Sequence, residues 1–339
     1  MTVAINARAA VRREIGGVER LAREMAARLP RLRPDRYRVI QPPAALAHRA
    51  GHVWEQVALP LHARRASLIY SPANLAPLAT GHRNVVVIHD VAALRHPDWY
   101  RPAYVAYQRA LLPRIARGAR LVITVSEFSK NEIVHVLGAN PDRITVVPNG
   151  VDERFRPDAH AALGMTRPYV LVVGTRITRK NTSALAQAAQ RLNALGVELV
   201  HAGSGRGYMR PEANANLREL GYVPDEQMPG LYAGALALAM PSLYEGFGLP
   251  ALEAMACGTP VVASNTTALP ETIGDAGVLV DPHDQQAFAD AVEQLVTDDT
   301  RRAELSKRAV QQARPFTWER TAALTDAAIE RLLATSPST

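Results

Sequence analysis

Residues 241–264 read PSLYEGFGLPALEAMACGTPVVAS, and this stretch predicts a strand end, a tight turn, a helix and a second strand. Gly246 and Gly248 allow the backbone to turn sharply and to come close to a ligand. Pro250 suits the first turn of a helix, where its fixed φ fits and its missing N–H is not needed. A helix between two apolar strands is the repeating unit of a parallel α/β sheet.

The same alternation of strand and helix continues on both sides of this stretch and forms two series. In the first, strands are predicted at 2–6, 37–40, 67–70, 84–90, 119–126 and 144–152, and helices at 17–29, 102–119 and 126–138. In the second, strands are predicted at 168–174, 197–203, 235–242, 259–264 and 276–281, and helices at 181–196, 228–235, 250–258 and 284–298. The strands are apolar on both faces, as buried parallel strands are. Two such series predict an α/β protein with two doubly wound domains.

The domain boundaries follow from where the pattern is interrupted. We expect an N-terminal domain over 1–152, a polar linker over 153–167 and a C-terminal domain over 168–314. A last helix over 315–335 follows Pro315, and we expect it to pack back on the N-terminal domain. A chain of 339 residues suits two domains of ordinary size.

Composition excludes several classes of protein. There is one cysteine, so a disulfide framework within the chain is impossible, and Cys257 is predicted to be a small buried side chain. No apolar run is long enough to span a bilayer, and the N-terminus reads as a strand, so we expect a cytoplasmic protein. The ten histidines lack metal-ligand spacing, and no G-x-G-x-x-G follows the first strand, which argues against a dinucleotide-dependent dehydrogenase.

Charge is distributed unevenly along the chain. Residues 1–150 hold 22 Lys and Arg against 10 Asp and Glu, a net charge of +12, whereas the remainder carries −5. The N-terminal half is therefore expected to meet an anionic partner, such as the inner face of a membrane, a phosphorylated lipid carrier or an acidic saccharide. A solvated basic surface explains the charge equally well. No recognised nucleic-acid-binding motif accompanies it, so no nucleic-acid partner is expected.

Candidate ligand-binding residues lie at the predicted strand ends. In an open α/β sheet, ligands bind beyond the carboxyl ends of the strands. Glu245 and Glu253 flank the glycine turn, and the helix that follows offers free N–H groups and a positive dipole to a phosphate or sugar oxygen. Two carboxylates there could accept hydrogen bonds from sugar hydroxyls, although a plain strand–helix connection with two surface glutamates also fits these residues.

The whole string resembles a known family. The residues EGFGLPALEAMACGTPVVAS are similar to the Glu-x7-Glu signature of retaining glycosyltransferases with the GT-B fold, in the large family 4 type that includes sucrose synthase-like enzymes and bacterial α-mannosyltransferases. Further segments resemble the same family: IGGVERLAREM, IHDVAALRHPDWY, VPNGVD, VVGTRITRKN and GYVPDEQMPGLYAGA. The resemblance thus extends over nearly the whole chain and implies two Rossmann-like domains that face each other across a cleft.

The resemblance also implies roles for individual residues in binding the donor. Glu245 would lie against the donor sugar and Glu253 would bind the ribose hydroxyls, while the backbone of Gly246, Phe247, Gly248 and Leu249 would contact the sugar and diphosphate. Arg179 and Lys180, in the loop that begins at Gly174, would neutralise the diphosphate. Val223 would present its backbone to the base, and Gly16 and Gly17 would form a loop over the diphosphate. His89 would hydrogen-bond a hydroxyl of the donor sugar.

The implied reaction is transfer of a hexose from a nucleoside diphosphate sugar to a hydroxyl of a saccharide or lipid-linked saccharide, with retention. Because the chain has no Asp-x-Asp motif, cations and helix ends are expected to replace a metal ion, and no cofactor is expected. The segment HDVAALRHPDWY resembles members that use GDP-mannose, with a UDP-sugar of glucose type as the alternative. A protein that binds a sugar nucleotide or an anionic glycan without catalysis is the alternative from another class.

Overall fold

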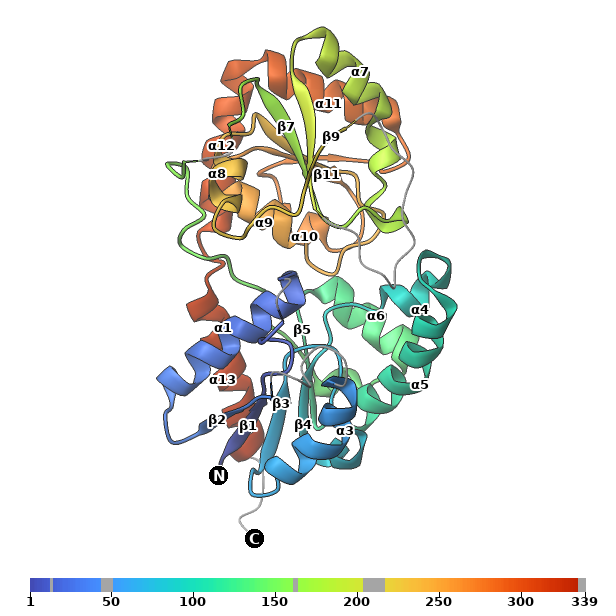
Figure 1. The fold of residues 1–339 in the computed structure, drawn as a ribbon, viewed down its shortest axis with the longest axis vertical. Coiled ribbons are helices and arrows are strands. Elements are labelled where there is room, and N and C mark those ends of the chain that lie inside the picture. Colours follow the sequence, from blue (N-terminus) through green and yellow to red (C-terminus); the bar gives the residue numbers. More distant parts are fainter. Residues whose placement is uncertain (13–14, 44–50, 161–163, 204–216, 335–339) are drawn as a thin grey trace. The chain divides into compact units, whose positions relative to one another are not determined.

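The structure is a computed structural model that describes residues 1–12, 15–43, 51–160, 164–203 and 217–334 (Figure 1). Its residues cluster into two compact units. Unit 1 comprises Met1–Arg95, Ala103–Gly150 and Trp318–Thr339, and unit 2 comprises His96–Pro102 and Val151–Thr317. Each unit contains one parallel sheet of six strands, so the predicted α/β architecture of two doubly wound domains is confirmed.

Unit 1 is built on a sheet with the strand order β2-β1-β3-β4-β5-β6. Its strands are β1 (Val3–Asn6), β2 (Tyr37–Ile40), β3 (Leu68–Ser71), β4 (Asn84–Val87), β5 (Leu121–Thr124) and β6 (Ile144–Val146). Its helices are α1 (Gly17–Leu32), α3 (Gly51–His62), α4 (Ala92–Arg95), α5 (Pro102–Gly118), α6 (Glu127–Leu137) and α13 (Trp318–Ala334). Ser126 caps α6, since its hydroxyl accepts a hydrogen bond from the backbone N–H of Ser129 at 3.0 Å.

Alternate side chains of the central strands β1, β3, β4 and β5 in unit 1 enter different cores. Val85 and Val87 of β4 join a cluster with α1 and α13, while Val86 joins a cluster with α5 and α6 on the opposite face. The period of two is that of a strand buried on both faces, which is why these segments read as continuous apolar runs.

The C-terminal helix α13 packs against α1 within unit 1. Its Asp326 accepts hydrogen bonds from the hydroxyl of Tyr37 at 2.7 Å and from Nε of Arg33 at 2.9 Å. The last helix of the chain is therefore held to the first helix and to β2 by both apolar and polar contacts.

Unit 2 is built on a sheet with the strand order β12-β11-β10-β7-β8-β9. Its strands are β7 (Tyr169–Val173), β8 (Glu198–Ala202), β9 (Arg218–Gly221), β10 (Ala237–Met240), β11 (Val261–Ser264) and β12 (Val278–Val280). Its helices are α7 (Ala186–Ala194), α8 (Met228–Ala233), α9 (Leu249–Ala256), α10 (Leu269–Ile273), α11 (Gln285–Thr297) and α12 (Asp299–Ala313). Strand β9 and helices α3, α4, α10 and α12 were not predicted.

Part of the expected linker packs on unit 2. The ring of Phe155 lies edge-on to Tyr232, with centroids 5.9 Å apart, and Arg154 pairs with Asp225. Cys257 is buried as predicted, and burial together with the charge of Glu253 raises the pKa of its thiol to about 12. The thiol therefore stays protonated and inert at neutral pH.

We predict that Ile329→Ala lowers the free energy of unfolding of unit 1 by about 2–5 kcal/mol, because Ile329 is fully buried where α13 meets α1. Leu324→Ala, on the same helix but 37% exposed, is the matched control and should change it by less than about 0.5 kcal/mol. Urea denaturation followed by tryptophan fluorescence measures both, since Trp318 lies in the same cluster as Ile329. Equal losses for the two variants would contradict the packing described for α13.

Candidate functional site

The loops that follow the neighbouring strands β7 and β10 of unit 2 are tied together. The backbone N–H of Leu243 donates to the carbonyl of Arg179 at 2.8 Å. The amide of Asn181 donates to the carbonyls of Pro241 and Pro282, at 3.1 and 2.8 Å. Asn181 itself has a left-handed backbone, with φ of 51°. Three strand-end loops thus meet at one side chain, at the carboxyl edge of the sheet.

A buried ion pair joins the first two of these loops. Nζ of Lys180 lies 2.6 Å from Oε1 of Glu245, and the side chains are only 11% and 8% exposed. The backbone N–H of Glu245 donates to the hydroxyl of Thr267 at 3.1 Å, which holds the main chain at the start of the glycine turn. Two residues 65 positions apart in the sequence therefore form one rigid unit at the strand ends.

Gly174 makes room for this lysine. A Cβ atom at Gly174 would lie 2.8 Å from Cε of Lys180, closer than real Cβ contacts, and its φ of 138° disfavours other residues. The carbonyl of Gly174 accepts a hydrogen bond from Nε2 of His201 at 2.9 Å. The first glycine of the predicted phosphate-binding loop thus serves close packing against Lys180.

Electrostatics keep Glu245 ionised although it is buried. Burial alone would raise its pKa, but the positive charges of Lys180 and Arg179 outweigh burial and hold the pKa below its usual value. Glu245 is therefore a carboxylate at neutral pH, and it is an acceptor of hydrogen bonds rather than a proton donor.

The glycine turn and helix α9 follow directly after Glu245. Gly248 is the N-terminal cap of α9 and has φ of 95°, a conformation that only glycine adopts without strain. The carbonyl of Phe247 accepts a hydrogen bond from the hydroxyl of Thr272. Gly246 and Leu249 are also buried. The turn is thus anchored by its own packing, as a strand–turn–helix junction requires.

Glu253 lies one turn inside α9 and is 5% exposed. Its Oε2 accepts a hydrogen bond from the hydroxyl of Tyr232 at 2.9 Å. The carboxylate is thereby oriented from α8.

Val223, another predicted site residue of unit 2, lies near the end of β9. Val223 is buried two residues beyond the end of β9, next to the half-exposed Tyr222. Arg176, for which the sequence indicated no role, pairs with Glu219 at 2.7 Å. Glu219 also contacts Nδ1 of His201 at 2.7 Å, so the loop that begins at Gly174 is linked to β8 and β9.

In unit 1, His89 follows β4 and is 7% exposed. Burial lowers the pKa of its ring, so it is neutral at pH 7. Its Nε2 lies 3.0 Å from the carbonyl of Pro72, which can only accept, so Nε2 carries the proton and Nδ1 is the acceptor. The backbone N–H of His89 also donates to the side-chain oxygen of Asn74 at 2.8 Å. The ring is therefore fixed in both orientation and tautomer.

Gly16 is the N-terminal cap of α1 and Gly17 is the first residue of this helix, also in unit 1. The backbone N–H of Gly16 donates to Oε2 of Glu19 at 3.0 Å, and Oε1 of the same carboxylate lies 3.3 Å from Arg12. Glu19 thus anchors the glycine pair to the first turn of the helix.

The structure therefore divides the predicted residues between the units. Unit 2 contains Gly174, Arg179, Lys180, Val223, Gly246, Phe247, Gly248, Leu249, Glu245 and Glu253, and unit 1 contains Gly16, Gly17 and His89. Sequence reasoning gave no role to Asn181 or Tyr232, although both lie in the quoted segments VVGTRITRKN and GYVPDEQMPGLYAGA, and it missed Thr267, a single polar residue in a loop. In the described ranges, no cluster of three or more His, Cys, Asp or Glu side chains could hold a metal ion.

Two parallel-sheet units, each with polar side chains at the carboxyl ends of its strands, are typical of the GT-B class of glycosyltransferases. Comparison with known proteins identifies the family. The model for "Glycosyl transferases group 1" matches residues 156–313, and that for "Glycosyltransferase Family 4" matches residues 34–155. The chain belongs to the glycosyltransferases of family 4 type and is a glycosyltransferase.

Individual relatives agree with this family. The chain is 37% identical over 257 residues to O-antigen chain mannosyltransferase B of Escherichia coli, covering 70% of this chain and 67% of that protein. It is 36% identical over 233 residues to a D-inositol 3-phosphate glycosyltransferase of Rhodococcus opacus (strain B4), covering 61% of this chain and only 52% of that protein. Sucrose-phosphate synthase from Thermosynechococcus elongatus has the same fold, with a TM-score of 0.77 at 19% identity over 99% of this chain and 100% of that chain.

We predict that Lys180→Met destabilises unit 2 by about 3–5 kcal/mol at pH 7, because it leaves the Glu245 carboxylate buried without its partner. In the wild type the lowered pKa of Glu245 stabilises the folded state at pH values above the ordinary pKa of glutamate. This stabilisation is lost as the pH falls through the lowered pKa of Glu245. In the variant the pKa is raised instead, so its deficit should shrink as the pH falls from 7 to 5.

The double variant Lys180→Met/Glu245→Gln is the control, and it should recover most of the lost stability at pH 7. Urea denaturation at pH 5 and pH 7 measures all three proteins. If the single and double variants lost equal stability at both pH values, the ion pair would not have the role described.

Proposed function

We propose that this glycosyltransferase moves mannose from GDP-mannose to a hydroxyl of a saccharide or lipid-linked saccharide, with retention and without a metal ion. The observation that carries the proposal is the Lys180–Glu245 pair at the carboxyl edge of the unit 2 sheet. Mannose is favoured by the 37% identity to the E. coli mannosyltransferase. The segment HDVAALRHPDWY, residues 89–100, resembles users of GDP-mannose.

The pair suits a diphosphate that leaves with negative charge. The Lys180 ammonium has three donors and uses one on Glu245, so two remain for phosphate oxygens. Arg179, the neighbouring residue in the chain, adds a second positive charge to the loop. Charge that develops on the leaving diphosphate would thus be stabilised by groups already fixed in place, which costs no reorganisation.

Glu245 suits a position against the donor sugar because it stays ionised. Its carboxylate would accept hydrogen bonds from sugar hydroxyls and favour positive charge at the anomeric carbon. In the proposed step, the bond from that carbon to the diphosphate oxygen breaks, and its electron pair leaves with the diphosphate. The acceptor oxygen bonds to the same face of the carbon, and its proton passes to a phosphate oxygen.

Glu253 and His89 complete the proposal. Oε2 of Glu253 accepts one bond from Tyr232, and a carboxylate has further acceptor sites for ribose hydroxyls. Nδ1 of His89 is an acceptor for a hydroxyl of the donor sugar, since Nε2 is used on Pro72. Both roles stay predictions that follow from the family resemblance.

A UDP-sugar donor of glucose type is the alternative, and the name of the Rhodococcus opacus relative, D-inositol 3-phosphate glycosyltransferase, does not specify mannose. A protein that binds a sugar nucleotide without transferring the sugar is the alternative outside enzymes. Both alternatives keep the same loops of unit 2, so binding and turnover must be measured separately.

We predict that GDP-mannose raises the melting temperature of the protein more than UDP-glucose or ADP-glucose does at equal concentration. A donor at 100 times its Kd stabilises the folded state by about 2.7 kcal/mol. The shift should persist in excess EDTA, because the proposal assigns the diphosphate to Arg179 and Lys180 rather than to a metal ion. A larger shift with UDP-glucose would indicate that UDP-glucose is the donor. Loss of the shift in EDTA would contradict a metal-free site.

We predict that Glu245→Gln and Lys180→Ala lower kcat by about a hundredfold or more and change KM far less, because both groups act on charge that develops in the transition state. Release of GDP from GDP-mannose measures the rate. Lys307→Ala, an exposed lysine of α12, is the control and should leave the rate unchanged. Unchanged turnover in both site variants would reject the assigned roles.

We also propose that unit 1 contacts an anionic membrane surface through α3. Val53, Val57 and Leu61 are spaced four residues apart on this helix and are 65%, 61% and 66% exposed. The exposed Arg64 and Arg65 lie just beyond the C-terminal end of α3. An apolar helix face beside basic residues is typical of helices that lie in a membrane interface. No helix in the described part of the chain is long and apolar enough to cross a bilayer.

Val57→Asp/Leu61→Asp should reduce binding to vesicles with 30% anionic lipid by about tenfold or more, because two charges replace apolar anchors. Co-sedimentation measures binding, with vesicles of neutral lipid as the reference. Leu195→Asp in unit 2, 45% exposed in the wild type, should bind as the wild type does. Equal binding of all three proteins would reject α3 as the contact.

A further inference from the structure

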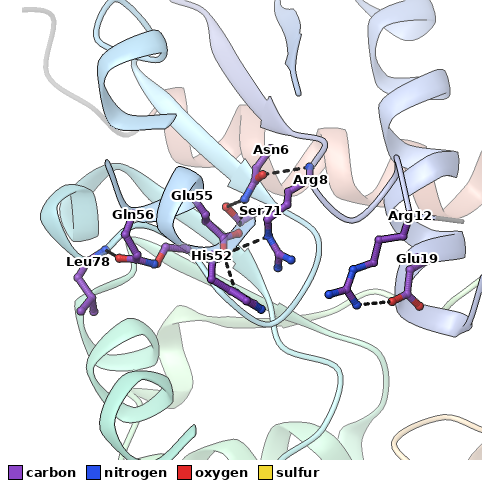
Figure 2. Close-up of polar contacts among 10 residues, drawn as sticks. Asn6, Arg8, Arg12, Glu19, His52, Glu55, Gln56, Ser71 and Leu78 are labelled. Atoms are coloured by element: carbon purple, nitrogen blue, oxygen red, sulfur yellow. Dashed lines mark hydrogen bonds and ion pairs between the residues drawn. The ribbon is translucent and has the colours of Figure 1, made fainter. Parts of the chain in front are cut away.

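A second buried polar cluster lies in unit 1, at the carboxyl ends of β1 and β3 (Figure 2). Asn6 is its centre, because its amide donates to Oε1 of Glu55 at 2.6 Å and to the hydroxyl of Ser71 at 3.2 Å. The side-chain oxygen of Asn6 accepts from the backbone N–H of Arg8 at 3.2 Å. Glu55, from α3, is completely buried. These residues have no part in the donor site proposed for unit 2.

Arg8 is the member of this cluster with unused hydrogen-bonding capacity. Its Nε lies 3.3 Å from Oε2 of Glu55, and its side chain is only 6% exposed. Neither terminal nitrogen, Nη1 or Nη2, has a partner among the residues that the structure describes. Nε is fully buried and makes no hydrogen bond, which costs free energy, and the donors of Nη1 and Nη2 are available to a ligand.

The charge of the cluster indicates what kind of ligand fits. Arg8 and Glu55 form a neutral pair, so an anion bound at Arg8 would add a buried negative charge without a counter-charge. A hydroxyl oxygen accepts a charge-assisted hydrogen bond from a guanidinium and adds no charge.

Two aromatic side chains belong to the surroundings of the cluster. The rings of His52 and Tyr107 lie edge to face, with centroids 5.6 Å apart, and Nδ1 of His52 lies 3.7 Å from Oε2 of Glu55. Burial and then the charge of Glu55 raise the pKa of Tyr107, so its phenol remains a hydrogen-bond donor at neutral pH. Rings with polar tips beside a guanidinium offer both apolar contact and hydrogen bonds, as a sugar ring requires.

We propose that Arg8 binds a neutral, hydroxyl-bearing saccharide, the acceptor, in unit 1. Glu55 is a positioning residue that holds the guanidinium, and Asn6 holds Glu55. This inference rests on the proposed function, which assigns the donor to the loops of unit 2. The carboxyl edge of the unit 1 sheet is the equivalent location for a second ligand.

The test uses octyl α-D-mannopyranoside as a neutral probe and mannose 6-phosphate as an anionic probe, with saturation-transfer NMR as a binding readout that needs no turnover. Arg8→Lys keeps the charge that pairs with Glu55 but loses the planar fork of donors. It should weaken binding of the octyl mannoside by about tenfold to a hundredfold, the range for hydrogen bonds to a charged group. The melting-temperature shift with GDP-mannose should stay as in the wild type.

The effect on turnover should be confined to the acceptor. Arg8→Lys should raise KM for the octyl mannoside by the same factor and leave KM for GDP-mannose unchanged. Glu55→Gln should also raise KM for the octyl mannoside. Arg8→Met/Glu55→Gln removes both charges, so that neither charge remains buried without its partner. Arg38→Lys, an exposed arginine on β2, is the matched control and should bind both probes as the wild type does.

Three results would overturn the proposal: unchanged affinity of Arg8→Lys for the octyl mannoside, no NMR signal from that probe with the wild type, or tighter binding of mannose 6-phosphate that Arg8→Lys abolishes. The last would show that the ligand is an anion. Failure of the proposed function gives a different result, in which no nucleotide sugar shifts the melting temperature of the wild type. The NMR result for Arg8 would still stand in that case.

Discussion

Both sheets of this protein are covered on both faces, and this constraint decides where its polar chemistry can lie. Side chains along a strand enter one core or the other, as Val85 and Val86 do, so a charged group within a strand would be buried without a partner. Charged residues therefore lie at strand ends or on the edge strands β2 and β9, where Arg38 and Glu219 are. At the strand ends they form closely matched pairs, Lys180 with Glu245 in unit 2 and Arg8 with Glu55 in unit 1.

The sequence predicts a strand correctly where burial on both faces of the sheet requires a continuous apolar run. All six strands of unit 1 are short apolar runs, and so are five of the six strands of unit 2. The exception is β9, whose Arg218 and Glu219 are exposed at the sheet edge and read as loop. Helix α12 was missed because most of its surface is charged, and α3 because Pro60 interrupts it and its exposed residues include the apolar Val53, Val57 and Leu61.

The types of residue in the candidate site could be predicted from the sequence, but the contacts between them could not. Glycines, carboxylates and cations at predicted strand ends indicated a site for a phosphorylated ligand, and the Glu-x7-Glu string indicated the family. No spacing rule connects Lys180 to Glu245, because their pairing depends on β7 and β10 being neighbours in the sheet. Arg8 belongs to no sequence motif. A single arginine after a strand becomes informative only when the structure places Glu55 of α3 beside it.

The side chain of Asn181 has a consequence for how this enzyme can exchange its ligands. Its amide joins the loops after β10 and β12 to its own loop, so a movement of one loop alone would break hydrogen bonds worth about 0.5–1.5 kcal/mol each. A joint movement of the three strand-end loops of unit 2 would keep both bonds.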